Sequence, residues 1–157
     1  MHPGELVDEV LNAAIAEVAA RELPVFTFAL YFDHESEAIS VCVDTEENSA
    51  RTVAAINSYN ARHFHRALAD GDLKMAELWQ ANIGRSLSLG DFALVNVARR
   101  EMPGAEQSDA FFLLLMRKLV VREREIAALC LERERLVLAC SGVASEVAYV
   151  WSANSDA

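Results

Sequence analysis

The pattern of hydrophobic and polar positions is most regular in the first third of the chain. Apolar residues between Leu6 and Val18 recur with helical spacing, which predicts an amphipathic helix over residues 5–22. Side chains then alternate over residues 25–32 and 39–44, and the bulky apolar ones share a face of the first segment. A short polar stretch joins the two segments. The pattern therefore predicts a hairpin of half-buried antiparallel strands.

After the hairpin the pattern becomes helical again. Thr45 or Asn48 suits the N-cap of a helix over residues 48–69. Further along, the pattern predicts a helix over residues 73–81 and a strand over residues 92–98. A second helix over residues 109–134 and a second strand over residues 136–140 follow. We expect a bend near Val121, because charges fall there where the apolar stripe should continue. Residues 147–151 fit either a strand or a helical turn.

This order of elements predicts the fold class. Residues 1–157 are expected to form a single α+β domain, with a mixed or antiparallel-leaning sheet of about four to five strands covered by helices. The chain is long enough to bury one core. Hydrophobic residues make up 53% of it, which argues against disorder and favours some apolar surface buried against a partner.

Several features point to a cytoplasmic location. No apolar run reaches the ~18 residues that a membrane-spanning helix needs. The first residues lack the basic and apolar regions of a signal peptide. Cys42, Cys130 and Cys140 lie far apart in apolar segments, as is typical of reduced, buried thiols.

Acidic residues are concentrated at the start of the chain. Residues 1–50 hold 11 of the 24 acids and one base, whereas residues 51–157 hold 13 of each, so the net charge of −10 belongs to the first segment. The acids of the hairpin fall at its tip and at its base, namely Asp33, Glu35 and Glu37, and Asp44, Glu46 and Glu47. Such a field disfavours nucleic acid and anionic membranes and would steer a basic protein towards these candidate binding residues. Alternatively, the acidic excess only keeps the protein soluble.

Thr45-Glu46-Glu47 is the most suggestive polar cluster for chemistry. Carboxylates at a strand-to-helix junction can perform acid–base catalysis, but they also suit a helix N-terminus without any catalysis. The chain contains no Gly-x-Ser-x-Gly, HExxH, CxxC or phosphate-binding glycine pattern. On a helix, His63 and His65 would point to different sides. We therefore expect no catalytic residue, no metal and no cofactor.

Residues 111–116 are apolar around the whole circumference of a predicted helix. One helix face packed on a sheet cannot bury all of these side chains, so some are expected to meet a second subunit. The sequence thus predicts a homodimer that pairs through the region from Phe111 to Met116.

A set of motifs resembles a known family. The chain carries FALY at residues 28–31, Asp33, DTEE at residues 44–47 and RSLSLGDF at residues 85–92. These are similar to a bacterial domain family of unknown function with a "FALY … D … NTEE" N-terminal half and a later Gly-Asp-aromatic element. Asp44 stands where an asparagine is common in that family, and no tryptophan lies beside the Gly-Asp step. The resemblance implies a small cytoplasmic bacterial domain without an established activity. By analogy, some families of this kind are immunity proteins that neutralise toxins.

Two classes of function follow from these observations. The first hypothesis is a non-enzymatic protein-binding module, of the toxin-immunity type, that acts through its acidic N-terminal region. The alternative is a small hydrolytic or small-molecule-processing enzyme that uses the carboxylates between Asp44 and Glu47.

Overall fold

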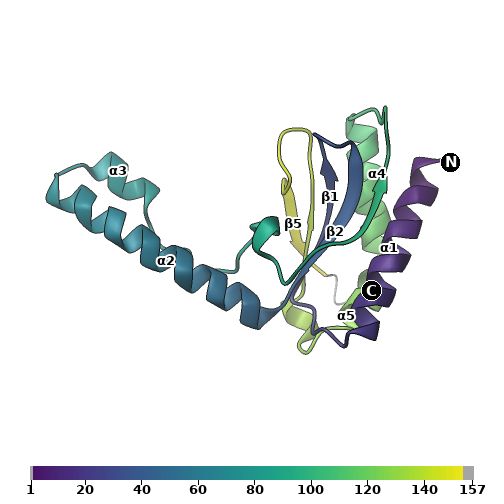
Figure 1. The fold of residues 1–157 in the computed structure, drawn as a ribbon, viewed down its shortest axis with the longest axis horizontal. Coiled ribbons are helices and arrows are strands. Elements are labelled where there is room, and N and C mark those ends of the chain that lie inside the picture. Colours follow the sequence, from purple (N-terminus) through teal and green to yellow (C-terminus); the bar gives the residue numbers. More distant parts are fainter. Residues whose placement is uncertain (1, 154–157) are drawn as a thin grey trace.

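A long hairpin lies at the centre of the sheet (Figure 1). The computed structural model describes residues 2–153. Strands β1 (Thr27–Asp33) and β2 (Ala38–Asp44) pair antiparallel over seven residues each, from Thr27 opposite Asp44 to Asp33 opposite Ala38. The predicted hairpin is therefore confirmed.

Three further strands complete a mixed sheet in the order β3-β2-β1-β4-β5. β3 (Leu94–Glu101) pairs antiparallel with β2, β4 (Val137–Cys140) pairs parallel with β1, and β5 (Tyr149–Ser152) pairs antiparallel with β4. The α+β class is confirmed. The open choice for residues 147–151 is settled as a strand, because Val150 and Trp151 pair with β4.

The helices of the body cover one face of this sheet. α1 (Pro3–Ala20) and α4 (Asp109–Val121) lie side by side on it, with the short α5 (Glu123–Ala127) beyond α4 (Figure 1). The fully buried side chains that fill the space between helices and sheet include Val7, Leu11, Phe28, Leu30, Phe32, Ile39, Leu115 and Leu119. The bulky side of the predicted first strand thus forms the core.

The opposite face of the sheet is covered by loops. Its central positions carry small side chains, and these are packed under Leu89 of η1 (Leu89–Asp91), Phe92 and the partly buried Val147. Both hairpin strands are therefore buried on both faces, and the expectation of half-buried strands was wrong. The pattern misled because small side chains such as Ala29 and Cys42 are hidden by segments distant in the sequence.

The helical region after residue 109 also differs from the prediction. The bend near Val121 is confirmed, since α4 ends there and α5 follows after Arg122 (φ −97°, ψ 4°). However, α5 ends at Ala127 rather than continuing to residue 134, and a one-turn η2 (Arg133–Arg135) leads into β4. The chain must reverse here, because β4 runs parallel to β1.

A helical arm projects from the body (Figure 1). It consists of α2 (Glu46–Ala69), α3 (Leu73–Leu78) and the returning segment up to residue 84, and we call residues 46–84 the arm. Only Ser49 and Ala67 of α2 are buried. The helix does not pack an apolar face on the sheet, since Ile56 and Leu68 are exposed.

Candidate functional site: the acidic hairpin and the projecting arm

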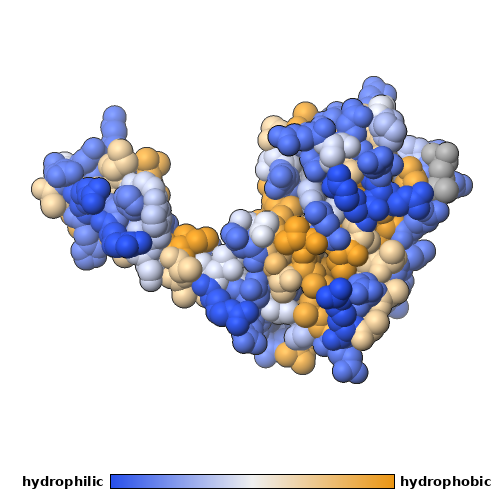
Figure 2. Space-filling model, in the orientation of Figure 1, coloured by the Kyte–Doolittle hydropathy of each residue, from blue (hydrophilic) through white to orange (hydrophobic). Residues whose placement is uncertain are grey.

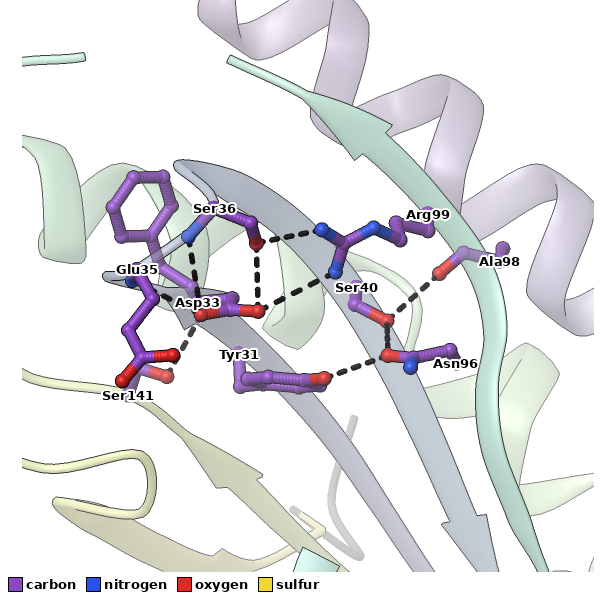
Figure 3. A network of polar contacts seen from close by, with 10 residues as sticks. Tyr31, Asp33, Glu35, Ser36, Ser40, Asn96, Ala98, Arg99 and Ser141 are labelled. Carbon is purple, nitrogen blue, oxygen red and sulfur yellow. Dashed lines mark hydrogen bonds and ion pairs between the residues drawn. The ribbon is translucent and has the colours of Figure 1, made fainter. Parts of the chain in front are cut away.

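The acidic tip of the hairpin is a hydrogen-bonded turn (Figure 3). Asp33 Oδ1 accepts from the backbone N–H groups of Glu35 at 3.1 Å and Ser36 at 3.4 Å, and its Oδ2 accepts from the Ser36 hydroxyl at 2.7 Å. Arg99 of β3 lies 3.5 Å from Asp33 and donates to Ser36 Oγ at 2.6 Å. Above all, the hydrogen bond from Ser36 holds the pKa of Asp33 below its usual value. Asp33 thus builds the turn.

The other two acids of the tip differ from each other. Glu37 has a left-handed backbone (φ 50°), and its carboxylate accepts from the N–H of Gly104 at 3.1 Å. Glu35 is exposed at the end of the turn, where Figure 3 shows its carboxylate directed away from Arg99. Among the three predicted tip residues, Glu35 is therefore the one most open to a partner.

At the base of the hairpin, Asp44 ends β2 and Thr45 precedes α2. Asp44 is fully buried, and its Oδ1 accepts from Thr45 N at 3.0 Å, Asn48 Nδ2 at 2.8 Å and Ala93 N at 3.1 Å. Burial raises the pKa of this carboxyl group. Thr45 Oγ1 accepts from Asn48 N at 3.1 Å, so Thr45 is the N-cap. The capping interpretation of this cluster is confirmed.

Glu46 and Glu47 point to different partners. Glu46 pairs with Arg135 at 2.6 Å, and Glu47 lies 3.4 Å from Arg51, one turn along α2. Both pairs are at least two-fifths exposed, so each adds little to stability. The carboxylates between Asp44 and Glu47 do not converge on a common point, as a catalytic pair would have to.

The acidic field of residues 1–50 is partly neutralised by bases from the second half of the chain. Lys118 pairs with Asp8 at 2.8 Å, and Arg100 pairs with Glu9 at 2.6 Å. Together with the Arg99 and Arg135 pairs already described, these contacts join segments about 65–110 residues apart in sequence. Charge counting along the sequence could not detect this neutralisation.

A groove of about 610 Å³ lies where the arm meets the body. Its apolar wall includes Pro24, Phe26 and Leu131, and its polar rim includes Glu47 and Arg135. The Arg85 guanidinium lies 3.6 Å from the centroid of the Phe26 ring. The groove is thus amphipathic, with charges of both signs at its rim.

A second polar network crosses the loop-covered face of the sheet (Figure 3). The hydroxyl groups of Tyr31 and Ser40 both donate to Asn96 Oδ1 at 2.6 Å. Asn96 has φ 54° and lies where the pairing of β2 and β3 shifts register, in a β-bulge. Burial raises the pKa of Tyr31. The network fixes the edge strand β3 and its bulge.

The arm is the surface that the sequence did not reveal. Leu73 is 73% exposed, Leu78 is 70% exposed and Ile83 is fully exposed. Figure 2 shows the arm standing clear of the body, with apolar side chains on its surface. One signal was available: between residues 48 and 69 the chain holds six alanines and three asparagines, whereas a helix that covers a sheet carries larger apolar residues.

Half of the side chains in the predicted dimer region are buried in the core of the same chain. Phe111, Phe112 and Leu115 are buried within the chain, while Leu113 is 43% exposed. Three of the six side chains therefore need no partner. Pairing of two chains through residues 111–116 stays a prediction.

We expect the three cysteines to react slowly in the folded protein. Burial raises the pKa of Cys140 to about 12 and that of Cys130 to about 11, and it also raises the pKa of Cys42. Since only the thiolate reacts, Ellman's reagent at about pH 8 should modify all three thiols quickly only after denaturation. Cys130 should react first in the folded state, because it alone is partly exposed. Rapid modification of Cys140 without denaturant would contradict this assignment.

Within residues 2–153, no group of three or more His, Cys, Asp or Glu side chains is placed to hold a metal ion. Every helix in that range is too short or too polar to span a bilayer.

No family model, no curated protein and no solved structure matches this chain.

Proposed function

We propose that this chain is a non-enzymatic protein-binding module and that its arm is the principal binding element. The observation that carries this proposal is a 24-residue helix with only two buried residues. Helices in proteins owe most of their stability to the packing of an apolar face. Exposed apolar side chains of the size of Leu73, Leu78 and Ile83, gathered on one projecting element, are typical of an interaction surface.

The arm has the rigidity that such a surface requires. Asn57 and Asn82 exchange two hydrogen bonds, of 3.0 Å and 2.8 Å, between α2 and the returning segment. Asn60 donates to the carbonyl of Gln80 at 3.3 Å. Tyr59, His63 and Trp79 form an aromatic cluster, with the His63 and Trp79 rings stacked at 4.3 Å. A preorganised surface loses less conformational entropy on binding.

The acidic hairpin has a secondary part in this proposal. With a net charge of −10, the protein would attract a basic partner, and Glu35 is the exposed acid of the hairpin tip. Long-range charge acts chiefly on the association rate and is screened by salt. The narrower hypothesis of a toxin-immunity protein stays a prediction, because neither the arm nor the hairpin specifies the identity of a partner.

The enzyme alternative has less support. Asp44 is occupied by hydrogen bonds from Thr45, Asn48 and Ala93, and Glu46 is paired with Arg135. The groove at the arm base could admit a small molecule, yet the carboxylates near it serve the local structure.

A photo-crosslinking experiment tests the proposed function. A photoreactive amino acid replaces Leu78 on the arm or, as a matched control, Val121 on the body, which is 78% exposed. In the source cell, the Leu78 position should give one defined protein adduct, and Leu73→Asp should abolish it. The Val121 position should give none. Adducts of equal yield at both positions, or at neither, would contradict the assignment of binding to the arm.

A further inference from the structure

One face of α2 carries a mostly apolar stripe that the described part of the chain leaves largely uncovered, although Asn57 at its centre is hydrogen-bonded to Asn82. Successive residues of the stripe are alternately four and three positions apart, as are the contact residues of helices that pair side by side. They are Ala50, Ala54, Asn57, Ala61, Phe64 and Leu68. Four of the six are exposed, and Asn57 and Phe64 are partly buried.

A groove runs beside the middle of this stripe. It has a volume of about 430 Å³ and lies between α2 and the returning segment. Asn57, Ala61 and Phe64 of the stripe line it, together with Trp79 and the fully exposed Ile83. A helix that packed along the stripe would therefore also meet an apolar hollow.

The stripe is complementary to itself. Its small residues, Ala50 and Ala54, lie near the body, and its large residues, Phe64 and Leu68, lie towards the tip. If two arms pack antiparallel about a two-fold axis midway between Asn57 and Ala61, then Ala50 lies opposite Leu68 and Ala54 opposite Phe64. Each large side chain then faces a small one, and the two-fold symmetry repeats this fit twice.

The charges agree with the same arrangement. Glu47 and Arg51 lie near the body, whereas Asp70 and Lys74 lie near the tip. Antiparallel packing brings Glu47 of one arm near Lys74 of the other, and Arg51 near Asp70. Within one chain Glu47 and Arg51 make an exposed contact of 3.4 Å, and Arg51 makes one further exposed hydrogen bond, to Asn48 at 3.5 Å. Both side chains can therefore exchange partners. The dipoles of the two helices also point in opposite directions, which is the favourable arrangement.

We infer that the partner of the arm is a second copy of this chain, bound through antiparallel packing of the two α2 helices. This inference rests on the proposed function of the arm as a protein-binding element. The 24-residue helix is about 36 Å long. Together, this helix and the groove beside it offer enough surface for the roughly 800 Å² per partner that stable interfaces bury.

Two neighbouring alanines supply the main test. Ala54 belongs to the stripe, whereas Ala55 is also exposed but points about 100° further around the helix. Sedimentation equilibrium of the wild type at high micromolar concentration should give twice the chain mass of 17.3 kDa. Ala54→Asp should weaken dimerisation at least about thirtyfold, because it buries an unpaired charge, and Ala55→Asp should leave it unchanged. Equal effects of the two substitutions, or a monomeric wild type, would overturn the inference.

Disulfide trapping tests the direction of packing. Chains with Ala50→Cys and chains with Leu68→Cys, both also carrying Cys130→Ala to remove the partly exposed native thiol, are mixed and oxidised. The remaining native thiols, Cys42 and Cys140, are buried. The cross-linked product should contain one chain of each kind. A disulfide between two Ala50→Cys chains would instead indicate parallel arms and would reject the proposed arrangement.

The outcomes separate this inference from the proposed function. A monomeric wild type whose Leu78 position still crosslinks to another protein contradicts the second-copy inference alone. A monomeric wild type without any adduct at Leu78 contradicts both.

Discussion

Replacement of Asp44 by alanine is expected to lower the free energy of unfolding by about 2–4 kcal/mol. The substitution removes the acceptor of two backbone N–H groups, those of Thr45 and Ala93. It also removes one of the two acceptors of the Asn48 side-chain amide, which keeps its hydrogen bond to the carbonyl of Asp91. The start of α2 and the segment before β3 would both lose a fixed contact. Chemical denaturation monitored by circular dichroism measures the effect. A loss below about 0.5 kcal/mol, which is usual for surface substitutions, would show that water replaces the carboxylate.

Asp44→Asn is the matched control, and it adds a pH dependence. Asparagine keeps an acceptor oxygen but carries no charge. Because burial raises the pKa of Asp44 in the folded protein, ionisation of this group favours the unfolded state. The wild type should therefore lose stability relative to Asp44→Asn as pH rises from below the unfolded pKa, near 4, through the folded pKa. The raised pKa would be contradicted if the difference in stability between the wild type and Asp44→Asn did not change with pH. It would also be contradicted if the wild type became relatively more stable as pH rises.

Arg85→Ala is expected to lower the free energy of unfolding by about 2–3 kcal/mol and to loosen the attachment of the arm. Arg85 donates to the carbonyls of Phe26 at 2.7 Å and Arg135 at 2.6 Å, and it stacks over the Phe26 ring. It thus joins the end of the arm to β1 and to the segment before β4. Amide hydrogen exchange should accelerate in residues 79–84 as well.

Two other substitutions isolate the cause of this effect. Arg85→Lys keeps the positive charge but lacks the planar fork that reaches both carbonyls, so it should lose most of the same stability. Arg117→Ala removes an exposed arginine of α4 and should change stability by less than about 0.5 kcal/mol. Full stability of Arg85→Lys would show that charge alone, rather than hydrogen-bond geometry, holds the arm.

Much of the fold could be predicted from local patterns. Alternation in residues 25–32 and 39–44 identified the hairpin, because strand side chains have a period of two. Thr45 was one of two predicted caps, with Asn48, and the structure selects Thr45, whose hydroxyl accepts from the N–H of a residue only three positions away. The break after Val121 was visible because charged residues interrupt the apolar stripe there. Each of these features depends on interactions within a few residues.

The sites were harder to predict, because they depend on distant contacts. Asp33 and Glu46 were expected as exposed binding residues, but Arg99 and Arg135 reach them from 66 and 89 residues away along the chain. Such partners are brought near only by the pairing of β2 with β3 and of β1 with β4. A count of charges along the sequence therefore overestimates the acidic surface.

The sequence by itself determined the hairpin, the cap of α2 and the α+β class, since periodicity and capping act over one or two turns of chain. Only the tertiary structure decided which face of each element is covered. It placed loops over Ala29 and Cys42, paired the early acids with late arginines, and left α2 projecting without cover. The physical reason is that burial depends on what the rest of the chain brings alongside a residue. An amphipathic stripe specifies that a helix packs, but it does not specify whether the packing partner belongs to the same chain or to another.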